Sequence, residues 1–125
     1  MNDTPAYAKL IVYRKAFKCS MEISKAAKYW PVHERYSLTD QIRRSSRSVC
    51  SNIAERHAKR RYPKHFSAKA SDALGESYET VTWLYFARAE GYLEEDKCEE
   101  MLAQFAEINR LLMHMIKHPE KFSLK

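Results

Sequence analysis

Residues that break helices are scarce in this chain, and those present divide it into four blocks of similar length. Its 125 residues include only two glycines and four prolines. The boundaries between blocks fall at Pro31, Tyr62-Pro63 and Gly91, and Pro119 closes the last block. Because apolar residues recur in each block about every three or four positions, the pattern predicts four long helices and no strands.

We expect these helices at about residues 7–30, 38–60, 64–90 and 94–117, in a single domain over 1–125 with loose ends at 1–6 and 119–125. Helices of about 20 residues with short links favour antiparallel neighbours. The predicted fold is therefore all-α, an antiparallel up-down-up-down four-helix bundle.

Local signals refine the helix ends. Ser37 is expected to cap the second helix, with Asp40 returning the bond three positions later. Gly91 is expected to supply a left-handed C-terminal cap for the third helix. Gly75 lies inside that helix, where glycine costs roughly 1 kcal/mol relative to alanine, and so suggests a close helix contact.

Three cysteines, Cys19, Cys50 and Cys98, are too few and too odd in number for a disulfide framework. They are expected to be reduced core residues of a cytoplasmic protein. The N-terminus lacks the pattern of a signal peptide. The chain also contains no run of about 18 apolar residues, so we expect no membrane span.

The net charge of +6 is concentrated in one segment. Residues 37–64 hold eight basic residues against two acidic ones, while the rest of the chain is balanced. The basic residues are Arg43, Arg44, Arg47, Arg56, Lys59, Arg60, Arg61 and Lys64. Such a segment can attract RNA or DNA. The alternative, a solvated helix end neutralised by neighbouring acids after folding, stays open.

One side of the second helix combines apolar and small residues, which favours close packing at the centre of the bundle. This side consists of Ile42, Ser45, Ser46, Val49, Cys50, Ile53 and His57. The opposite side carries Arg44, Ser48, Ser51 and Glu55. In a monomer those serines would face water, where Lys or Glu would be more favourable. We therefore favour self-association through this side; the alternative is that the serines are merely tolerated at the surface.

Two motifs are similar to a known family. The first consists of Gln41-Ile42-Arg43-Arg44, Ser48 and Asn52-Ile53-Ala54-Glu55; the second of Gly75, Glu79-Thr80, Trp83-Leu84, Ala87 and Gly91-Tyr92-Leu93. Over roughly residues 10–116, the chain resembles the small bacterial four-helix bundle proteins encoded in intervening sequences of 23S ribosomal RNA genes, once labelled ribosomal protein S23. Cys50 and Arg56 stand where that family usually has proline and glycine.

The resemblance implies a ring-like homopentamer but no established biochemical role. The chain is more distantly similar to accessory proteins of diversity-generating retroelements. Nucleic-acid and reverse-transcriptase binding is attributed to a positive surface of that group, and carrying this role over is analogy.

Catalytic and metal sites are not indicated, so we expect no enzyme, no cofactor and no bound metal. His114 and His118 lack a third ligand, which favours solvated histidines near a helix end. Cys50 and His57 are seven positions apart, near 10 Å along a helix, too far for a catalytic pair. With two glycines in the chain, a phosphate-binding loop is not expected.

Two sets of site residues follow. Nucleic-acid contacts are expected from Arg56, Lys59, Arg60, Arg61, Tyr62 and Lys64, with basic groups on phosphates and Tyr62 stacking on a base. A structural motif, in which Arg43 or Arg44 pairs with Glu55 or Glu79 to fix helix register, consists of Gln41, Arg43, Arg44, Asn52, Glu55 and Glu79. Catalysis by these carboxylates is the less favoured interpretation.

The predicted function is a non-enzymatic homo-oligomer that binds RNA or DNA without sequence specificity, since no sequence-reading motif is present. The alternative is a protein-interaction scaffold without a nucleic-acid role. Expected partners are other copies of the chain, RNA or DNA, and another protein in the alternative, with no membrane.

Overall fold

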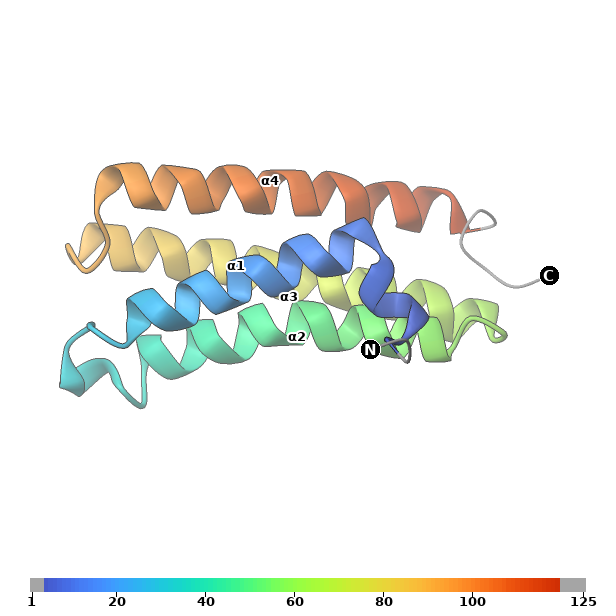
Figure 1. Cartoon of the computed structure of the whole chain (residues 1–125), viewed down its shortest axis with the longest axis horizontal. Coiled ribbons are helices and arrows are strands. Elements are labelled where there is room, and N and C mark those ends of the chain that lie inside the picture. The colour runs from blue at the N-terminus through green and yellow to red at the C-terminus, as the bar shows by residue number, and fades with distance from the viewer. Residues whose placement is uncertain (1–3, 120–125) are drawn as a thin grey trace.

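The computed structural model describes residues 4–119, which form an antiparallel four-helix bundle (Figure 1). The elements are η1 (Ala6–Lys9), α1 (Ile11–Ala27), η2 (Val32–Glu34), α2 (Leu38–Ala58), α3 (Pro63–Ala89) and α4 (Glu95–Lys117), where η denotes a 3-10 helix. Successive α-helices run in opposite directions, which confirms the predicted fold class. Of the predicted loose ends, residues 1–3 and 120–125 lie outside the described range.

The first helix is shorter at both ends than the predicted 7–30. Leu10 has extended backbone, with φ −67° and ψ 138°, and separates η1 from α1. At the other end the hydrogen-bond spacing shortens from four residues to three before Pro31, since the Trp30 N–H donates to the Ala27 carbonyl at 3.2 Å. The residue before a proline disfavours the helical region, so the helix ends early. The remaining helix ends lie within two residues of prediction.

The two predicted caps have different outcomes. The Ser37 side chain makes no capping hydrogen bond, so that prediction is wrong. Instead the Leu38 N–H donates to Oε1 of Glu34 at 3.3 Å, because η2 brings this carboxylate to the start of α2. The Gly91 prediction is confirmed: φ is +78°, and the N–H groups of Gly91 and Tyr92 donate to the carbonyls of Arg88 and Ala87. This pair of bonds satisfies carbonyls left free at the end of α3.

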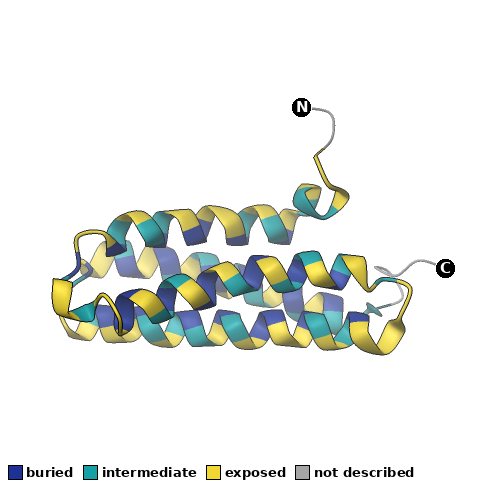
Figure 2. Ribbon diagram, turned by 90° about the horizontal axis from the view of Figure 1, so that it is seen from below, coloured by how far each residue is buried: buried dark blue, intermediate teal, exposed yellow. Residues whose placement is uncertain are grey.

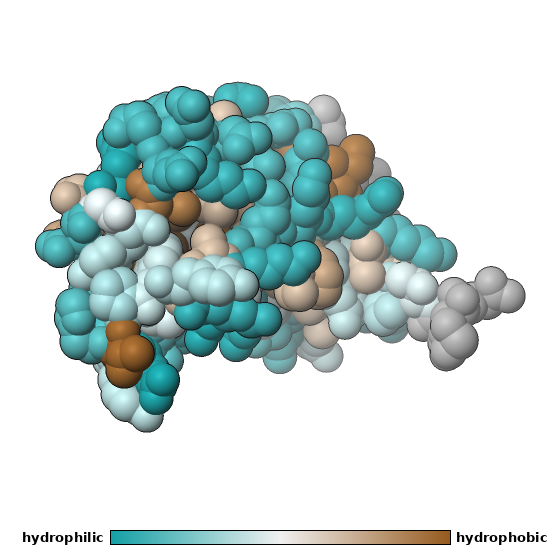
Figure 3. Space-filling model, turned by 60° about the vertical axis from the view of Figure 1, so that its left-hand side comes forward, coloured by the Kyte–Doolittle hydropathy of each residue, from teal (hydrophilic) through white to brown (hydrophobic). Residues whose placement is uncertain are grey.

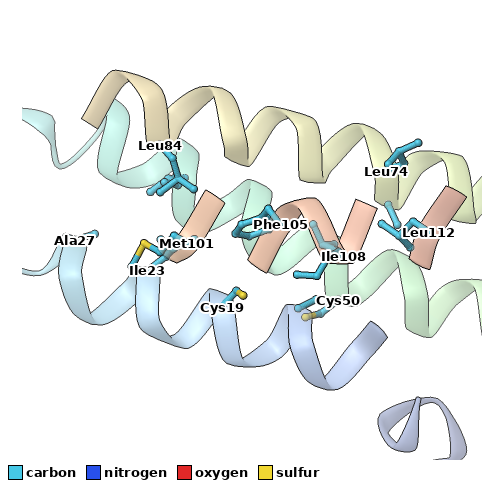
Figure 4. Packing of buried hydrophobic residues seen from close by; sticks show 14 of the residues in the cluster. Cys19, Ile23, Ala27, Cys50, Leu74, Leu84, Met101, Phe105, Ile108 and Leu112 are labelled. Atoms are coloured by element: carbon cyan, nitrogen blue, oxygen red, sulfur yellow. The ribbon is translucent and has the colours of Figure 1, made fainter. Parts of the chain in front are cut away.

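Side chains from all four helices fill the core. Figure 2 shows buried positions on the inward sides of the helices. Ile23, Ile53, Leu84 and Phe105, one from each of α1 to α4, are almost completely inaccessible, and Figure 4 shows neighbouring core residues between the helices. Cys19, Cys50 and Cys98 are buried and unbridged, as predicted. None of the helices in residues 4–119 is both long and apolar enough to cross a membrane.

Small polar side chains also join the helices inside the bundle. The hydroxyl pairs are Ser20–Ser46 at 3.1 Å between α1 and α2 and Ser45–Thr80 at 2.8 Å between α2 and α3. Ser77 of α3 donates to Oδ1 of Asn109 in α4. Buried polar groups are stable when they are paired, and short side chains let the helix backbones approach. These bonds therefore fix the relative register of neighbouring helices.

Gly75 does not make the predicted close helix contact. It is exposed on α3, and a Cβ added there would meet no atom of the described chain within 4 Å. Packing within one copy of this chain therefore does not require a glycine at this position.

Candidate nucleic-acid interface

The turn between α2 and α3 presents a group of basic side chains. α2 ends at Ala58, and the Tyr62 N–H donates to the Lys59 carbonyl at 2.8 Å before Pro63 opens α3. We call Lys59, Arg60, Arg61, Tyr62 and Lys64 the basic turn; all are exposed except Arg60, which is partly exposed. Because the turn is only a few residues long, it holds these charges together at one end of the bundle.

The acids nearest in sequence do not neutralise the basic turn. Within residues 4–119, Lys59, Arg60, Arg61 and Lys64 make no ion pair with a carboxylate. Glu55 and Asp72 both approach Nζ of Lys69 instead, the latter at 3.9 Å. Arg60 donates to the backbone carbonyl of His57 at 2.9 Å, which uses one of its five donors. Most of the hydrogen-bonding capacity of the turn is therefore available to phosphate.

Arg56 lies inside the protein and not on this surface. Its side chain is 3% exposed, and its guanidinium carbon is 3.6 Å from the centroid of the Phe66 ring. Burial lowers the pKa of Arg56 to about 10, so it stays charged at neutral pH. The predicted phosphate contact at Arg56 is thus corrected. The helical spacing could have indicated this burial, because Arg56 follows Ile53 by three residues and continues the buried stripe of α2.

Two further lysines lie at the same end of the bundle as the basic turn. Lys9, in η1, and Lys117, at the end of α4, are exposed and lie at the end where Figure 1 shows the α2–α3 turn. The start of α4 carries Glu94, Glu95, Asp96, Glu99 and Glu100 at the opposite end, which is largely hydrophilic in Figure 3. The basic turn with Lys9 and Lys117 and the acidic start of α4 therefore lie at opposite ends of the bundle. The count by sequence segments missed this because Lys9 and Lys117 are remote in sequence.

His57 borders the basic turn. Burial and the neighbouring charges of Arg60 and Arg56 lower the pKa of His57 below its usual 6.5. Its ring lies 6.2 Å from that of Tyr7. At neutral pH it is therefore an uncharged aromatic group and adds no charge to the surface.

Three motif residues of α2, Arg43, Arg44 and Glu55, connect it to its neighbours, while Gln41 and Asn52 bond within the helix. Arg44 forms ion pairs with Glu79 and, at 3.3 Å, with Glu76 of α3, and also contacts Gln41. Arg43 donates to the Ser24 carbonyl of α1 at 3.5 Å, and Asn52 to the Ser48 carbonyl at 2.9 Å. Glu55 pairs with Lys69. Glu55 and Glu79 therefore bind different cations, and each of these ion pairs joins α2 to α3.

These motif positions and the four-helix fold coincide with a known family. A model of the 23S rRNA-intervening sequence protein family matches residues 8–114. The chain belongs to this family. A solved protein of unknown function from the S23 ribosomal protein family of Bacteroides thetaiotaomicron aligns with this family member at 27% identity and a TM-score of 0.76, covering 86% of this chain and 96% of that one. No curated protein matches the chain.

Among residues 4–119 of this family member, no group has the features of a catalytic nucleophile or a metal site. Burial raises the pKa of Cys19 to about 12 and that of Cys50 to about 11, so neither thiol is an activated nucleophile. The rings of His114 and His118 are 4.6 Å apart, but the described residues hold no group of three or more metal-binding side chains.

Proposed function

We propose that this protein is a non-enzymatic homo-oligomer that binds RNA or DNA without sequence specificity through the basic turn. The observation that carries the proposal is that Lys59, Arg60, Arg61 and Lys64 lie together without a carboxylate partner among residues 4–119. Phosphates neutralise such a surface and release counterions. Tyr62, also exposed, supplies a ring on which a base can stack.

The family relationship makes RNA the first ligand to test, because the family is named for intervening sequences in 23S rRNA. The proposal includes a cytoplasmic location, which the three buried, unbridged cysteines support.

Self-association is supported by the outward side of α3. It carries Tyr78, Tyr85 and Phe86, each about half exposed, on the same helix as the exposed Gly75. Exposed aromatic residues and a position without a side chain suit close docking of another helix. In the proposed homopentamer, several copies of a weak basic turn would act together.

The test is fluorescence anisotropy with a labelled RNA of random sequence over a salt series. We expect affinity to fall steeply with salt, and Arg60→Glu/Arg61→Glu to abolish binding. Lys25→Glu/Lys28→Glu makes the same change of charge on exposed residues at the other end of the bundle and should weaken binding much less. Absence of salt-sensitive binding by the native protein at low ionic strength would refute the proposal.

The exposed aromatic side of α3 also favours the second candidate, a scaffold for another protein. Co-purification of a protein that survives nuclease treatment and is lost in Tyr78→Lys would support this alternative. Light scattering tests the homo-oligomer directly, and a monomer at all concentrations would contradict self-association in both candidates.

A further inference from the structure

A groove runs between α1 and α2 and begins beside the basic turn. It has a volume of about 450 Å³, within the range of roughly 300–1,000 Å³ that is usual for small-molecule sites. We call it the α1–α2 groove; the lining residues used below are Tyr7, Tyr13, Phe17, Met21, Arg47 and Ser51. Neither the motifs nor the charge of the chain indicated it.

Three aromatic side chains follow one another along this groove. The Tyr7 and Tyr13 rings have centroids 5.3 Å apart and meet edge to face, while Tyr13 and Phe17 are 6.1 Å apart and inclined by 24°. Phe17 is 51% exposed and Met21 48% exposed, although both are large and apolar. A flat apolar ligand would cover these side chains and find aromatic rings to stack on.

The rim of the groove is cationic. Arg47 is exposed and lines the groove, and no hydrogen bond or ion pair occupies its guanidinium within residues 4–119. At the other end, Tyr7 lies against His57, whose carbonyl accepts a hydrogen bond from Arg60 of the basic turn. The rings therefore lie between two sources of positive charge, the turn and Arg47.

We infer that the α1–α2 groove receives an unpaired base of single-stranded RNA or DNA, with the adjoining phosphates on the basic turn and Arg47. Stacked aromatic rings beside cationic groups are the common means of binding single strands without reading sequence. Bases of a duplex are stacked on each other and cannot enter such a groove. This inference rests on the proposed function and adds to it a preference for single strands.

The charges favour a nucleic acid over the same groove of a second copy as the occupant. A two-fold pairing of grooves would bring each Arg47 and each basic turn close to the same groups of its partner. Like charges placed together across an interface are costly, whereas phosphates would neutralise them. A neighbour in the proposed ring would present a different surface, and the light-scattering outcome below distinguishes that case.

The experiment compares a labelled oligouridine with an RNA duplex of equal length, using the full chain at low salt. We expect the single strand to bind more tightly. Phe17→Ala keeps every charge and should weaken single-strand binding by roughly 5- to 140-fold while leaving duplex binding unchanged. Tyr36→Ala is the control, since Tyr36 is 88% exposed and lies in the link at the opposite end.

The outcomes separate this inference from the proposed function. If Arg60→Glu/Arg61→Glu abolishes binding but Phe17→Ala leaves single-strand affinity unchanged, the groove inference is overturned and the proposed function stands. If the native protein binds neither ligand, both fail. If Phe17→Ala instead lowers the mass measured by light scattering, the groove is a subunit interface and the inference is again overturned.

Photo-crosslinking tests base insertion on the native protein, so the result does not depend on whether a variant folds. An oligonucleotide carrying 5-bromouracil should photo-crosslink to the peptide that contains Tyr13, Phe17 and Met21. Crosslinks confined to the basic turn would contradict base insertion into the groove.

Discussion

The guanidinium carbon of Arg56 lies 3.6 Å from the centroid of the Phe66 ring and joins α2 to α3 directly behind the basic turn. Both side chains are almost fully buried. Arg60, four positions later, is partly exposed and donates a hydrogen bond to the His57 carbonyl at the end of α2. Two arginines one helical turn apart therefore have different roles, one in stability and one at the proposed interface.

Replacing Arg56 should change stability and not binding. We expect Arg56→Ala to lower the free energy of unfolding by about 1–3 kcal/mol, because the contact with Phe66 and the packing of the long side chain are both lost. Arg61→Ala, on the exposed turn, should stay within about 0.5 kcal/mol of the native protein. Urea denaturation measures the free energy of unfolding of both variants. In RNA anisotropy the order should be reversed, with the larger effect on binding from Arg61→Ala. A stable Arg56→Ala protein with weakened RNA binding would disprove this assignment.

The Ser45–Thr80 hydroxyl pair predicts that α2 tolerates no larger side chain at its centre. Ser45 is fully buried and bonded to Thr80 at 2.8 Å. Ser45→Leu should cost about 1–3 kcal/mol through overpacking, with an added cost for the lost hydrogen bond. Ala103→Leu, on the exposed side of α4, is the matched control. Equal thermal stability of the two variants would show that α2 and α3 do not need this close approach.

Features fixed by a few neighbouring residues could be predicted from the sequence. Gly91 ends α3 through the left-handed conformation that glycine allows, as predicted. Pro31 marks the break after the first helix, but α1 already ends at Ala27. The Ser37 cap failed for a related reason. Glu34, held by η2, provides the acceptor for the start of α2, and the short helix that positions it was not predicted.

Features created by the fold could not be predicted in this way. The basic end gathers Lys9, the α2–α3 turn and Lys117, which are at least fifty residues apart along the chain. The α1–α2 groove likewise needs Tyr7 and Tyr13 from one segment beside Arg47 from another. Arg56 is the intermediate case, because its position on the helical stripe was compatible with burial, whereas the prediction followed its charge and placed it at the surface.

The two glycines should respond oppositely to alanine. Gly75 is in the middle of α3 with open space around it, so Gly75→Ala should raise the free energy of unfolding by about 0.5–1 kcal/mol. Gly91→Ala should lower it by about 1 kcal/mol, because φ is +78° there and a side chain strains that conformation. Urea titrations at low protein concentration test both. Destabilisation by Gly75→Ala that grows with protein concentration would indicate that another copy packs against this position.

Acid should destabilise the protein in part through His57. Burial and the charges of Arg60 and Arg56 lower the pKa of His57 in the folded protein, so the unfolded chain takes up a proton first as pH falls. The stabilisation is present above the unfolded pKa of about 6.5 and is lost as pH falls through that value towards the folded pKa. His57→Asn should therefore show a smaller loss of thermal stability between about pH 7 and 5. A parallel pH dependence in both proteins would exclude His57 as a cause.

The three thiols should be protected from reagents as long as the bundle is folded. Burial raises the pKa of Cys19 to about 12 and that of Cys50 to about 11, and also raises that of Cys98. Only the thiolate reacts, and a rise of about two pKa units lowers its population roughly 100-fold at pH 8, before the barrier of burial is counted. Ellman's reagent should react with all three thiols in denaturant and with almost none in the native protein. Rapid labelling of one cysteine in the native protein would show that its helix opens locally. If Cys50, which lines the α1–α2 groove, is labelled in this way, oligouridine should slow its reaction with Ellman's reagent.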